Sequence, residues 1–278
     1  MRMVLVTLFV VLAIATLGAA GVLWTGAYNV AGNSQHTQAV YSLLERALQQ
    51  SVRLRARNIR APALDDPRLL QRGAICYRDN CAQCHGAPAI AAADFALGMQ
   101  PLPGPLIDAT ARWRSRELYW ITRNGITMSG MPAWEYRLAD NDLWAVVAFV
   151  QRLSAISARE VHELSSQLTG EQCRQAKPLA SDLPVAGDPS RGRIALHQHG
   201  CNGCHVIPGI TGSDVHVGPP LNGIASRQLI AGSVPNTPEH MARWIRDPRS
   251  VDRWTAMPDL RVSERDARDM AAYLATLH

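Results

Sequence analysis

The pattern of apolar and polar residues divides this 278-residue chain into an apolar run, a mixed helix and two longer segments that resemble each other. Met3 to Trp24 is an uncharged, mostly apolar run of 22 residues. As an α-helix it is about 33 Å long, which is enough to cross the hydrocarbon core of a bilayer. The apolar region of a signal peptide is usually shorter, about 7–15 residues. We therefore expect an uncleaved anchor over residues 1–26, although Leu17-Gly18-Ala19-Ala20-Gly21 resembles a cleavage site.

Residues 34–60 carry apolar side chains at helical spacing, with arginines between them. The apolar positions are Val40, Leu43, Leu44, Leu48, Val52 and Ile59, and the arginines are Arg46, Arg53, Arg55, Arg57 and Arg60. Pro62 and Pro67 then interrupt the helix, because the residue before a proline disfavours helical geometry. The pattern predicts a helical stalk within residues 27–66. Its surface suits anionic lipid, a partner protein or plain solvent, and the sequence leaves these three open.

Two segments, residues 67–157 and 188–278, repeat one plan of amphipathic helices separated by proline-containing loops. Asp66 is positioned to cap the first helix of one segment, and Asp188-Pro189 to open the first helix of the other. In the first segment we expect a short helix over residues 117–123 and a closing helix over 140–153. The second segment predicts a helix over 238–246 and a closing helix from Ser263-Glu264.

Between these segments, residues 158–187 are expected to form a linker with some helical potential. No strand-like alternation of any length occurs along the chain. The predicted fold class is therefore all-α: an N-terminal transmembrane helix and a helical stalk, followed by two helical domains.

The net charge of +5 is concentrated near the amino terminus. Residues 1–69 hold seven arginines and three acidic residues, whereas the two domains are each close to balance. A surface for nucleic acid needs a basic patch, and neither domain has the excess of basic residues for one. We therefore expect no nucleic-acid partner.

The pentapeptide Cys81-Ala82-Gln83-Cys84-His85 recurs as Cys201-Asn202-Gly203-Cys204-His205. Cys-x-x-Cys-His is the attachment signature of a c-type haem. Two thiols three positions apart lie on one helical turn, from which both can form thioethers to the porphyrin, and the next histidine reaches the iron. The repeat predicts two covalently bound haem c groups, with His85 and His205 as iron ligands.

A methionine followed by proline stands at a similar distance after each motif. Met131 follows His85 by 46 residues, and Met257 follows His205 by 52 residues. A thioether opposite an imidazole is the ligand pair of electron-transfer cytochromes c. We expect Met131 and Met257 to be the second iron ligands, with Met128 as a competitor of Met131.

Zinc binding and thiol redox chemistry are the alternative uses of such cysteine pairs. Zinc-ribbon pairs are usually about 15–20 residues apart, whereas more than a hundred residues separate these two pairs. A thioredoxin-like motif needs a βαβ setting, which the sequence does not predict. The remaining cysteines, Cys76 and Cys173, suit a disulfide in the oxidising compartment where haem c is attached. Two buried free thiols are the alternative.

On these motifs the chain resembles class I cytochromes c twice over, across residues 70–157 and 188–278. Gly218-Pro219-Pro220-Leu221 and Ser129-Gly130-Met131-Pro132 add to the likeness. The resemblance implies that the Pro219 carbonyl accepts the second ring N–H of His205. In the first domain it implies a similar acceptor near Pro103-Gly104-Pro105.

The arrangement also resembles membrane-bound dihaem cytochromes that serve terminal oxidases or periplasmic dehydrogenases. It implies a single-pass protein of the bacterial inner membrane with its haem domains in the periplasm. The favoured hypothesis is a non-catalytic electron-transfer subunit that relays electrons between a respiratory complex and a soluble cytochrome or cupredoxin. The alternatives are a docking subunit of a periplasmic dehydrogenase and a dihaem peroxidase. A peroxidase needs an iron that lacks methionine, and four further histidines bear on this: His197, His199, His216 and His240.

Overall fold

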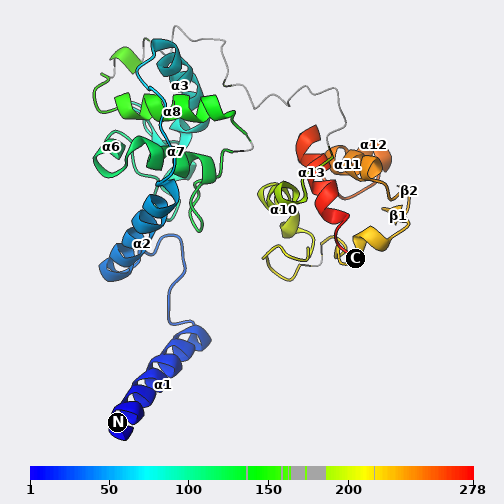
Figure 1. Ribbon diagram of the computed structural model, residues 1–278, viewed down its shortest axis with the longest axis horizontal. Helices are drawn as coiled ribbons and strands as arrows, with labels where there is room; N and C mark the ends of the chain where they lie inside the picture. Colours follow the sequence, from blue (N-terminus) through cyan, green and yellow to red (C-terminus); the bar gives the residue numbers. More distant parts are fainter. Residues whose placement is uncertain (136, 158, 162, 164–172, 174–185, 216) are drawn as a thin grey trace. The chain divides into compact units, whose positions relative to one another are not determined.

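The computed structural model describes residues 1–135, 137–157, 159–161, 163, 173, 186–215 and 217–278. The chain divides into two compact units, Met1–Gln175 and Ala176–His278, and each is described by itself (Figure 1). The described residues are mostly helical, with one pair of two-residue strands, so the predicted all-α class is confirmed. Most of the expected linker over residues 158–187 lies outside the described residues.

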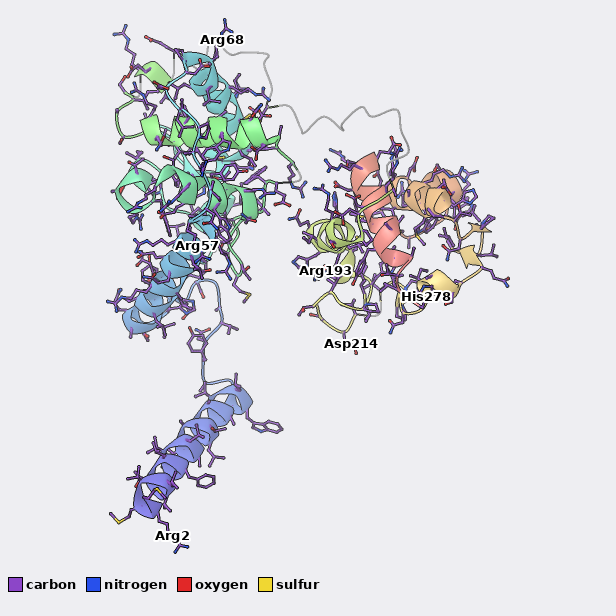
Figure 2. All side chains as sticks on the ribbon, viewed as in Figure 1. Arg2, Arg57, Arg68, Arg193, Asp214 and His278 are labelled. Atoms are coloured by element: carbon purple, nitrogen blue, oxygen red, sulfur yellow. A yellow bond between two sulfur atoms is a disulfide. The ribbon has the colours of Figure 1, made fainter. Side chains whose placement is uncertain are left out.

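The first helix, α1 (Arg2–Thr25), is apolar along its length and has no buried residue. Its best 18-residue window has a mean hydropathy of 2.6, and Arg2 stands at its first turn (Figure 2). The hydroxyl of Thr16 donates to the carbonyl of Leu12 one turn earlier, which keeps this polar group paired in an apolar setting. By length and composition α1 is able to cross a membrane, a test that a signal sequence also passes.

The predicted stalk contains α2 (Gln38–Ala56), and the second half of this helix packs against domain one. Val52 and Ala56 are fully buried. The Arg116 guanidinium donates to the carbonyl of Arg57, which follows the helix, at 3.4 Å. The sequence left lipid, a partner protein and solvent open as surroundings of this helix. Its second half instead lies on the chain's own first domain.

Domain one is built on α3 (Pro67–Asn80) and α8 (Asp140–Arg152), with short helices between them in the chain. These are α4 (Ala82–His85), α5 (Asp94–Leu97), α6 (Ala109–Arg112) and α7 (Ser115–Asn124). The side chain of Asp66 accepts a hydrogen bond from the Arg68 N–H at 2.9 Å, so the predicted N-cap is present. The expected helices over 117–123 and 140–153 are found within two residues of their predicted ends.

A glycine sets how closely α3 and α8 approach. A Cβ added to Gly73 would lie 2.0 Å from the carbonyl oxygen of Ala145, so only glycine fits here. Beside this contact Arg72 forms an ion pair with Asp142 at 2.7 Å. The apolar faces of the two helices enclose the core of the domain, which includes Tyr77 and Phe149 with their rings 5.3 Å apart.

Domain two begins with α10 (Pro189–Gln198) and closes with α13 (Glu264–Leu274). Between them are η1 (Cys201–Gly203), η2 (Ile224–Ser226), β1 (Leu229–Ile230), β2 (Val234–Pro235), α11 (Pro238–Arg246) and α12 (Pro248–Val251). The strands pair antiparallel, with Ile230 opposite Val234. The predicted helix over 238–246 has the predicted bounds. Asp188 and Ser263 cap the first and last helices.

The crossing of α10 and α13 repeats that of domain one. A Cβ on Gly192 would lie 1.8 Å from the carbonyl oxygen of Asp269. Arg191, like Arg72 the residue before the glycine, pairs with the Asp269 carboxylate at 3.0 Å. In both domains the close helix crossing fixes the position of the first helix, which leads directly into the Cys-x-x-Cys-His segment.

Candidate haem sites

In domain one the cysteine motif forms a single turn at the end of α3. Cys81 ends that helix, and its carbonyl accepts hydrogen bonds from the N–H groups of Cys84 and His85, both at 3.0 Å. The chain leaves the turn through Gly86, whose φ is 61° and where a Cβ would meet the Ile90 carbonyl at 2.5 Å. Cys81, Cys84 and His85 therefore lie on one short helical turn.

The second motif forms the same turn after α10. Gly200, with a left-handed φ of 72°, reverses the chain before Cys201. The Cys201 carbonyl accepts from the N–H groups of Cys204 at 3.2 Å and His205 at 2.9 Å. Cys81, Cys84, Cys201 and Cys204 are all free thiols. Two independent segments of the chain therefore present the same donor set.

A backbone carbonyl orients each histidine ring. The Nδ1 of His205 lies 2.7 Å from the carbonyl oxygen of Pro219, and the Nδ1 of His85 lies 2.7 Å from that of Gly104. A carbonyl oxygen only accepts, so Nδ1 carries the proton in both rings. In the neutral ring this leaves the lone pair on Nε2, which is the form that binds a metal. The same bond makes the imidazole a stronger ligand.

Gly218 lets the Pro219 loop lie against the His205 ring. A Cβ at this position would be 2.5 Å from the ring carbon Cε1. The loop is fixed on both sides of the acceptor, because the Gly218 N–H donates to the Cys204 carbonyl at 2.8 Å and the Leu221 N–H donates to that of Val206 at 2.9 Å. These two hydrogen bonds hold the loop against one side of the ring.

The segment before Met131 forms a tight loop. The Met131 N–H donates to the Ser129 hydroxyl at 3.1 Å, and its carbonyl accepts from the Ile126 N–H at 3.2 Å. Gly125 has a φ of 68°, and a Cβ there would lie 2.7 Å from the Met131 carbonyl oxygen. The Met131 side chain is half-buried, whereas Met128 is 93% exposed. This difference favours Met131 over Met128 as the ligand.

Met257 is held in the same manner in domain two. Its N–H donates to the hydroxyl of Thr255, two residues earlier, at 3.2 Å. Its side chain is half-buried, like that of Met131. Each of the two methionines lies in the same compact unit as the histidine with which the sequence pairs it.

Burial keeps the first cysteine of each pair protonated. It raises the pKa of the Cys81 thiol to about 12, with a smaller contribution from the neighbouring Cys84. Burial likewise raises the pKa of Cys201 to about 11. Attachment as a thioether leaves no charge on the sulfur, so the buried positions suit covalent attachment.

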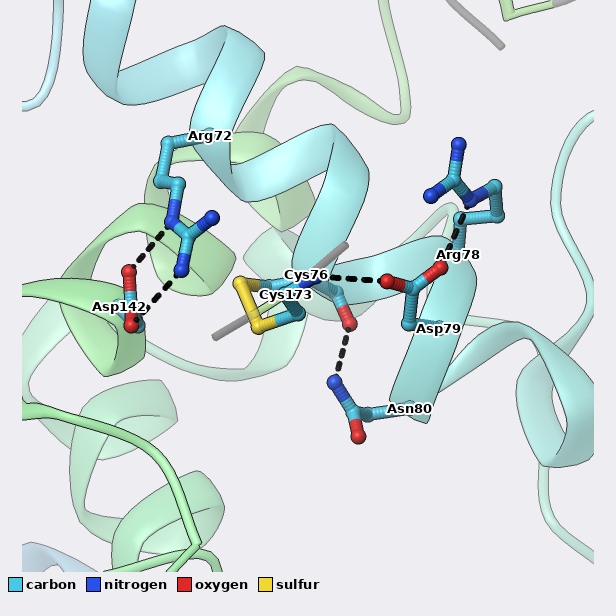
Figure 3. Close-up of a disulfide and its surroundings, with 7 residues drawn as sticks. All are labelled: Arg72, Cys76, Arg78, Asp79, Asn80, Asp142 and Cys173. Atoms are coloured by element: carbon cyan, nitrogen blue, oxygen red, sulfur yellow. Dashed lines mark hydrogen bonds and ion pairs between the residues drawn. A yellow bond between two sulfur atoms is a disulfide. The ribbon is translucent and has the colours of Figure 1, made fainter. Parts of the chain in front are cut away.

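Cys76 and Cys173 form a disulfide (Figure 3). It attaches residue 173 to α3, and the Cys173 N–H also donates to the Asp79 carboxylate at 2.7 Å. Burial works to raise the pKa of Asp79, but this hydrogen bond and those from Arg78 outweigh it and the pKa is lowered. Asp142 lies close to the two sulfurs, but bonded sulfurs offer no thiolate, so this group is not a metal site.

A peroxidase site would need another histidine near an iron. His197 is exposed. The Nε2 of His199 lies 3.4 Å from the Asp266 carboxylate, and the Nδ1 of His240 lies 3.0 Å from the Pro235 carbonyl. His216 lies outside the described residues. The rings of His199 and His240 therefore already have hydrogen-bond partners within domain two.

Two features of the site were not predicted from the sequence. Gly104 is the acceptor for His85, whereas the motif Pro103-Gly104-Pro105 named only a neighbourhood. The acceptor lies 19 residues after the histidine in domain one and 14 residues after it in domain two. The spacing in domain two therefore does not predict the acceptor in domain one. The contact of Met99 with Gly130, described below, has no sequence signal.

Known proteins match both domains. Residues 68–150 match the family model for cytochrome c oxidase, cbb3-type, subunit III, and residues 190–278 match the model for cytochrome c. A stretch of 89 residues, 32% of this chain, is 36% identical to cytochrome c oxidase subunit 2 of Alkalihalophilus pseudofirmus. The match spans 25% of the length of that relative. The chain thus contains two cytochrome c-type domains in tandem, which indicates covalently bound haem c and electron transfer.

Proposed function

We propose that this chain is a membrane-anchored dihaem cytochrome c that relays electrons between a respiratory membrane complex, such as a terminal oxidase, and a periplasmic partner. The observation that carries the proposal is the repeated donor set. In each domain two free thiols precede a histidine whose Nδ1 forms a hydrogen bond with a backbone carbonyl. The match to the oxidase subunit III model supports the link to an oxidase, and α1 supports the anchor.

The residues present fit a covalent haem in each domain. The thiols are free where thioethers are needed, and the absence of a Cβ at Gly218 leaves room for the ring of His205. Haem c, when bound, supplies a one-electron redox centre. In domain one we assign its attachment to Cys81, Cys84, His85 and Met131, and in domain two to Cys201, Cys204, His205 and Met257. The protein's part is to orient each imidazole and to hold each methionine loop closed.

This ligand set favours a carrier over an enzyme. With His and Met both bound to the iron, each site would offer no open position for peroxide or oxygen. A peroxidase needs such a position. The proposal therefore assigns electron transfer to both domains and catalysis to neither.

The order of the domains suggests which partner each one meets. Domain one follows the anchor and α2 directly in the chain, so we assign it to the membrane complex. Domain two, at the far end of the chain, is assigned to a soluble cytochrome or cupredoxin. One tether keeps both redox centres at high effective concentration near a membrane partner.

Cyanide and peroxide distinguish the carrier from the enzyme. The oxidised full chain in detergent is expected to bind cyanide only slowly, by displacement of methionine, and to show no rapid peroxide reduction. Met257→Ala is the positive control, because it should open one position and admit cyanide at one haem. Rapid peroxide turnover by the wild type would overturn the assignment.

A separate experiment identifies the partner. Isolation of the protein from native membranes would show which complex accompanies the chain.

A further inference from the structure

In domain one a methionine from a distant segment packs on the residue before Met131. A Cβ built on Gly130 would lie 1.7 Å from the terminal methyl carbon of Met99 and 3.4 Å from its sulfur. The backbone of Gly130 is not in the left-handed region, so its conformation does not demand glycine. The methyl group of Met99 fills the space that a side chain at residue 130 would take.

This contact joins the two loops that the His85–Met131 ligand pair depends on. Met99 lies five residues before Gly104, whose carbonyl orients His85. Its own backbone is anchored, since the Met99 N–H donates to the carbonyl of the fully buried Ala96 at 3.2 Å. Gly130 directly precedes Met131. Opening the methionine loop therefore means breaking the packing of Met99 on Gly130.

Domain two is built differently at this position. The residue before Met257 is Ala256, which already carries a methyl group. The segment from its histidine to the carbonyl acceptor is shorter, 14 residues against 19, and includes no methionine. Met241 and Met270 are buried in the core of that domain. The methionine contact thus distinguishes the first domain from the second among the residues that the structure describes.

We propose that Met99 is a positioning residue for the sixth iron ligand of domain one, holding the Met131 loop closed by packing on Gly130. The inference rests on the proposed function, because it takes Met131 as the ligand. Removing Met99 leaves the loop held by its own hydrogen bonds alone. The loop then opens more readily, and an added ligand competes better with the Met131 sulfur. The readout is binding of imidazole to the oxidised protein, which needs no partner and no turnover.

Four variants of the full chain test the packing. Met99→Ala is expected to tighten imidazole binding at one haem about tenfold, equivalent to about 1.4 kcal/mol. Gly130→Ala should tighten imidazole binding less, because the methyl group that it meets is the end of the flexible Met99 side chain, which can move aside. The double variant should return to within about threefold of wild type, since the small side chain at 99 makes room for the methyl at 130. Met99→Leu keeps most of the volume and should stay near wild type.

Met128→Ala is the matched control, since Met128 is 93% exposed and belongs to the same loop. The haem of domain two serves as an internal reference in every variant. A haem count of two for each variant shows that it has matured. The proposal is overturned if Met99→Ala binds imidazole like Met128→Ala, if the two alanine effects simply add, or if Met99→Leu behaves like Met99→Ala.

Failure of the inference is separable from failure of the proposed function. Met131→Ala is expected to remove half of the weak red band of methionine-ligated ferric haem. If it does so while Met99→Ala leaves imidazole binding unchanged, only the role of Met99 is wrong. If Met131→Ala leaves the band intact, the ligand assignment itself is wrong and the inference falls with it.

Discussion

Gly218→Ala is expected to destabilise domain two by displacing the His205 ring from its acceptor. The new Cβ would lie 2.5 Å from the ring carbon Cε1, and ordinary Cβ contacts begin at 3.4 Å. The ring and the loop must therefore separate by about 0.9 Å at this point. The bond from Nδ1 to the Pro219 oxygen, now 2.7 Å, would then lie beyond normal hydrogen-bonding distance.

Two terms set the magnitude. A lost hydrogen bond costs about 0.5–1.5 kcal/mol, and forcing extra volume into a packed site costs about 1–3 kcal/mol. The movement that relieves the collision also breaks the hydrogen bond, so the two costs are not fully additive. We expect the free energy of unfolding of domain two to fall by about 1–3 kcal/mol in total. For a domain of this size each kcal/mol lowers the melting temperature by about 4–8 °C.

Thermal unfolding of the oxidised full chain, followed by haem absorbance, measures this change. Gly203→Ala is the control, since it lies in the same domain, between Cys201 and Cys204, and its new Cβ has nothing within 4 Å. The transition of domain one should not move in either variant. If Gly218→Ala and Gly203→Ala melt at the same temperature, the ring is not held as described and the reasoning is refuted.

Three further results are expected. Replacing Cys76 and Cys173 together by serine should lower the stability of domain one by about 2–5 kcal/mol in urea unfolding while the chain keeps its haem; unchanged stability would contradict a structural disulfide. Burial raises the pKa of Asp266, but hydrogen bonds from His199 and Ser263 outweigh it and hold the pKa below 3.8. Its ionised form therefore stabilises domain two above about pH 4, and this contribution is lost as the pH falls through the lowered pKa. Asp266→Asn should therefore weaken the fall in the free energy of urea unfolding on the acid side of its pH profile. An unaltered pH dependence would count against the His199–Asp266 interaction. Mass spectrometry of membrane-extracted protein should find α1 retained, and a start near Gly21 would contradict the anchor.

The cysteine motifs and helix caps were predictable because their signals are local. Asp66, Asp188 and Ser263 cap helices through contacts within three residues, so the sequence contains everything they need. The Cys-x-x-Cys-His turn is equally local. The predicted ends of the helices over 117–123, 140–153 and 238–246 were accurate to within two residues for the same reason. The stalk helix is four residues shorter at each end than the pattern over 34–60.

Contacts between segments far apart in the chain could not be predicted from the sequence. Nothing in the stalk pattern indicates that Val52 and Ala56 are buried against domain one, because the same apolar spacing serves lipid, a partner or the chain itself. Gly104 and Met99 lie in a loop whose length differs between the domains, so the second domain gave no template. Gly73 and Gly192 have no helical signature either, and their role follows from the helix crossing alone.

Counting haem per chain tests the central claim most directly. Pyridine-haemochrome absorbance, divided by protein concentration from amino-acid analysis, is predicted to give two haems for the wild type. Serine at both Cys81 and Cys84 should remove one, and serine at both Cys201 and Cys204 should remove the other. One haem in the wild type, or two in either variant, would contradict the account of two matched covalent sites.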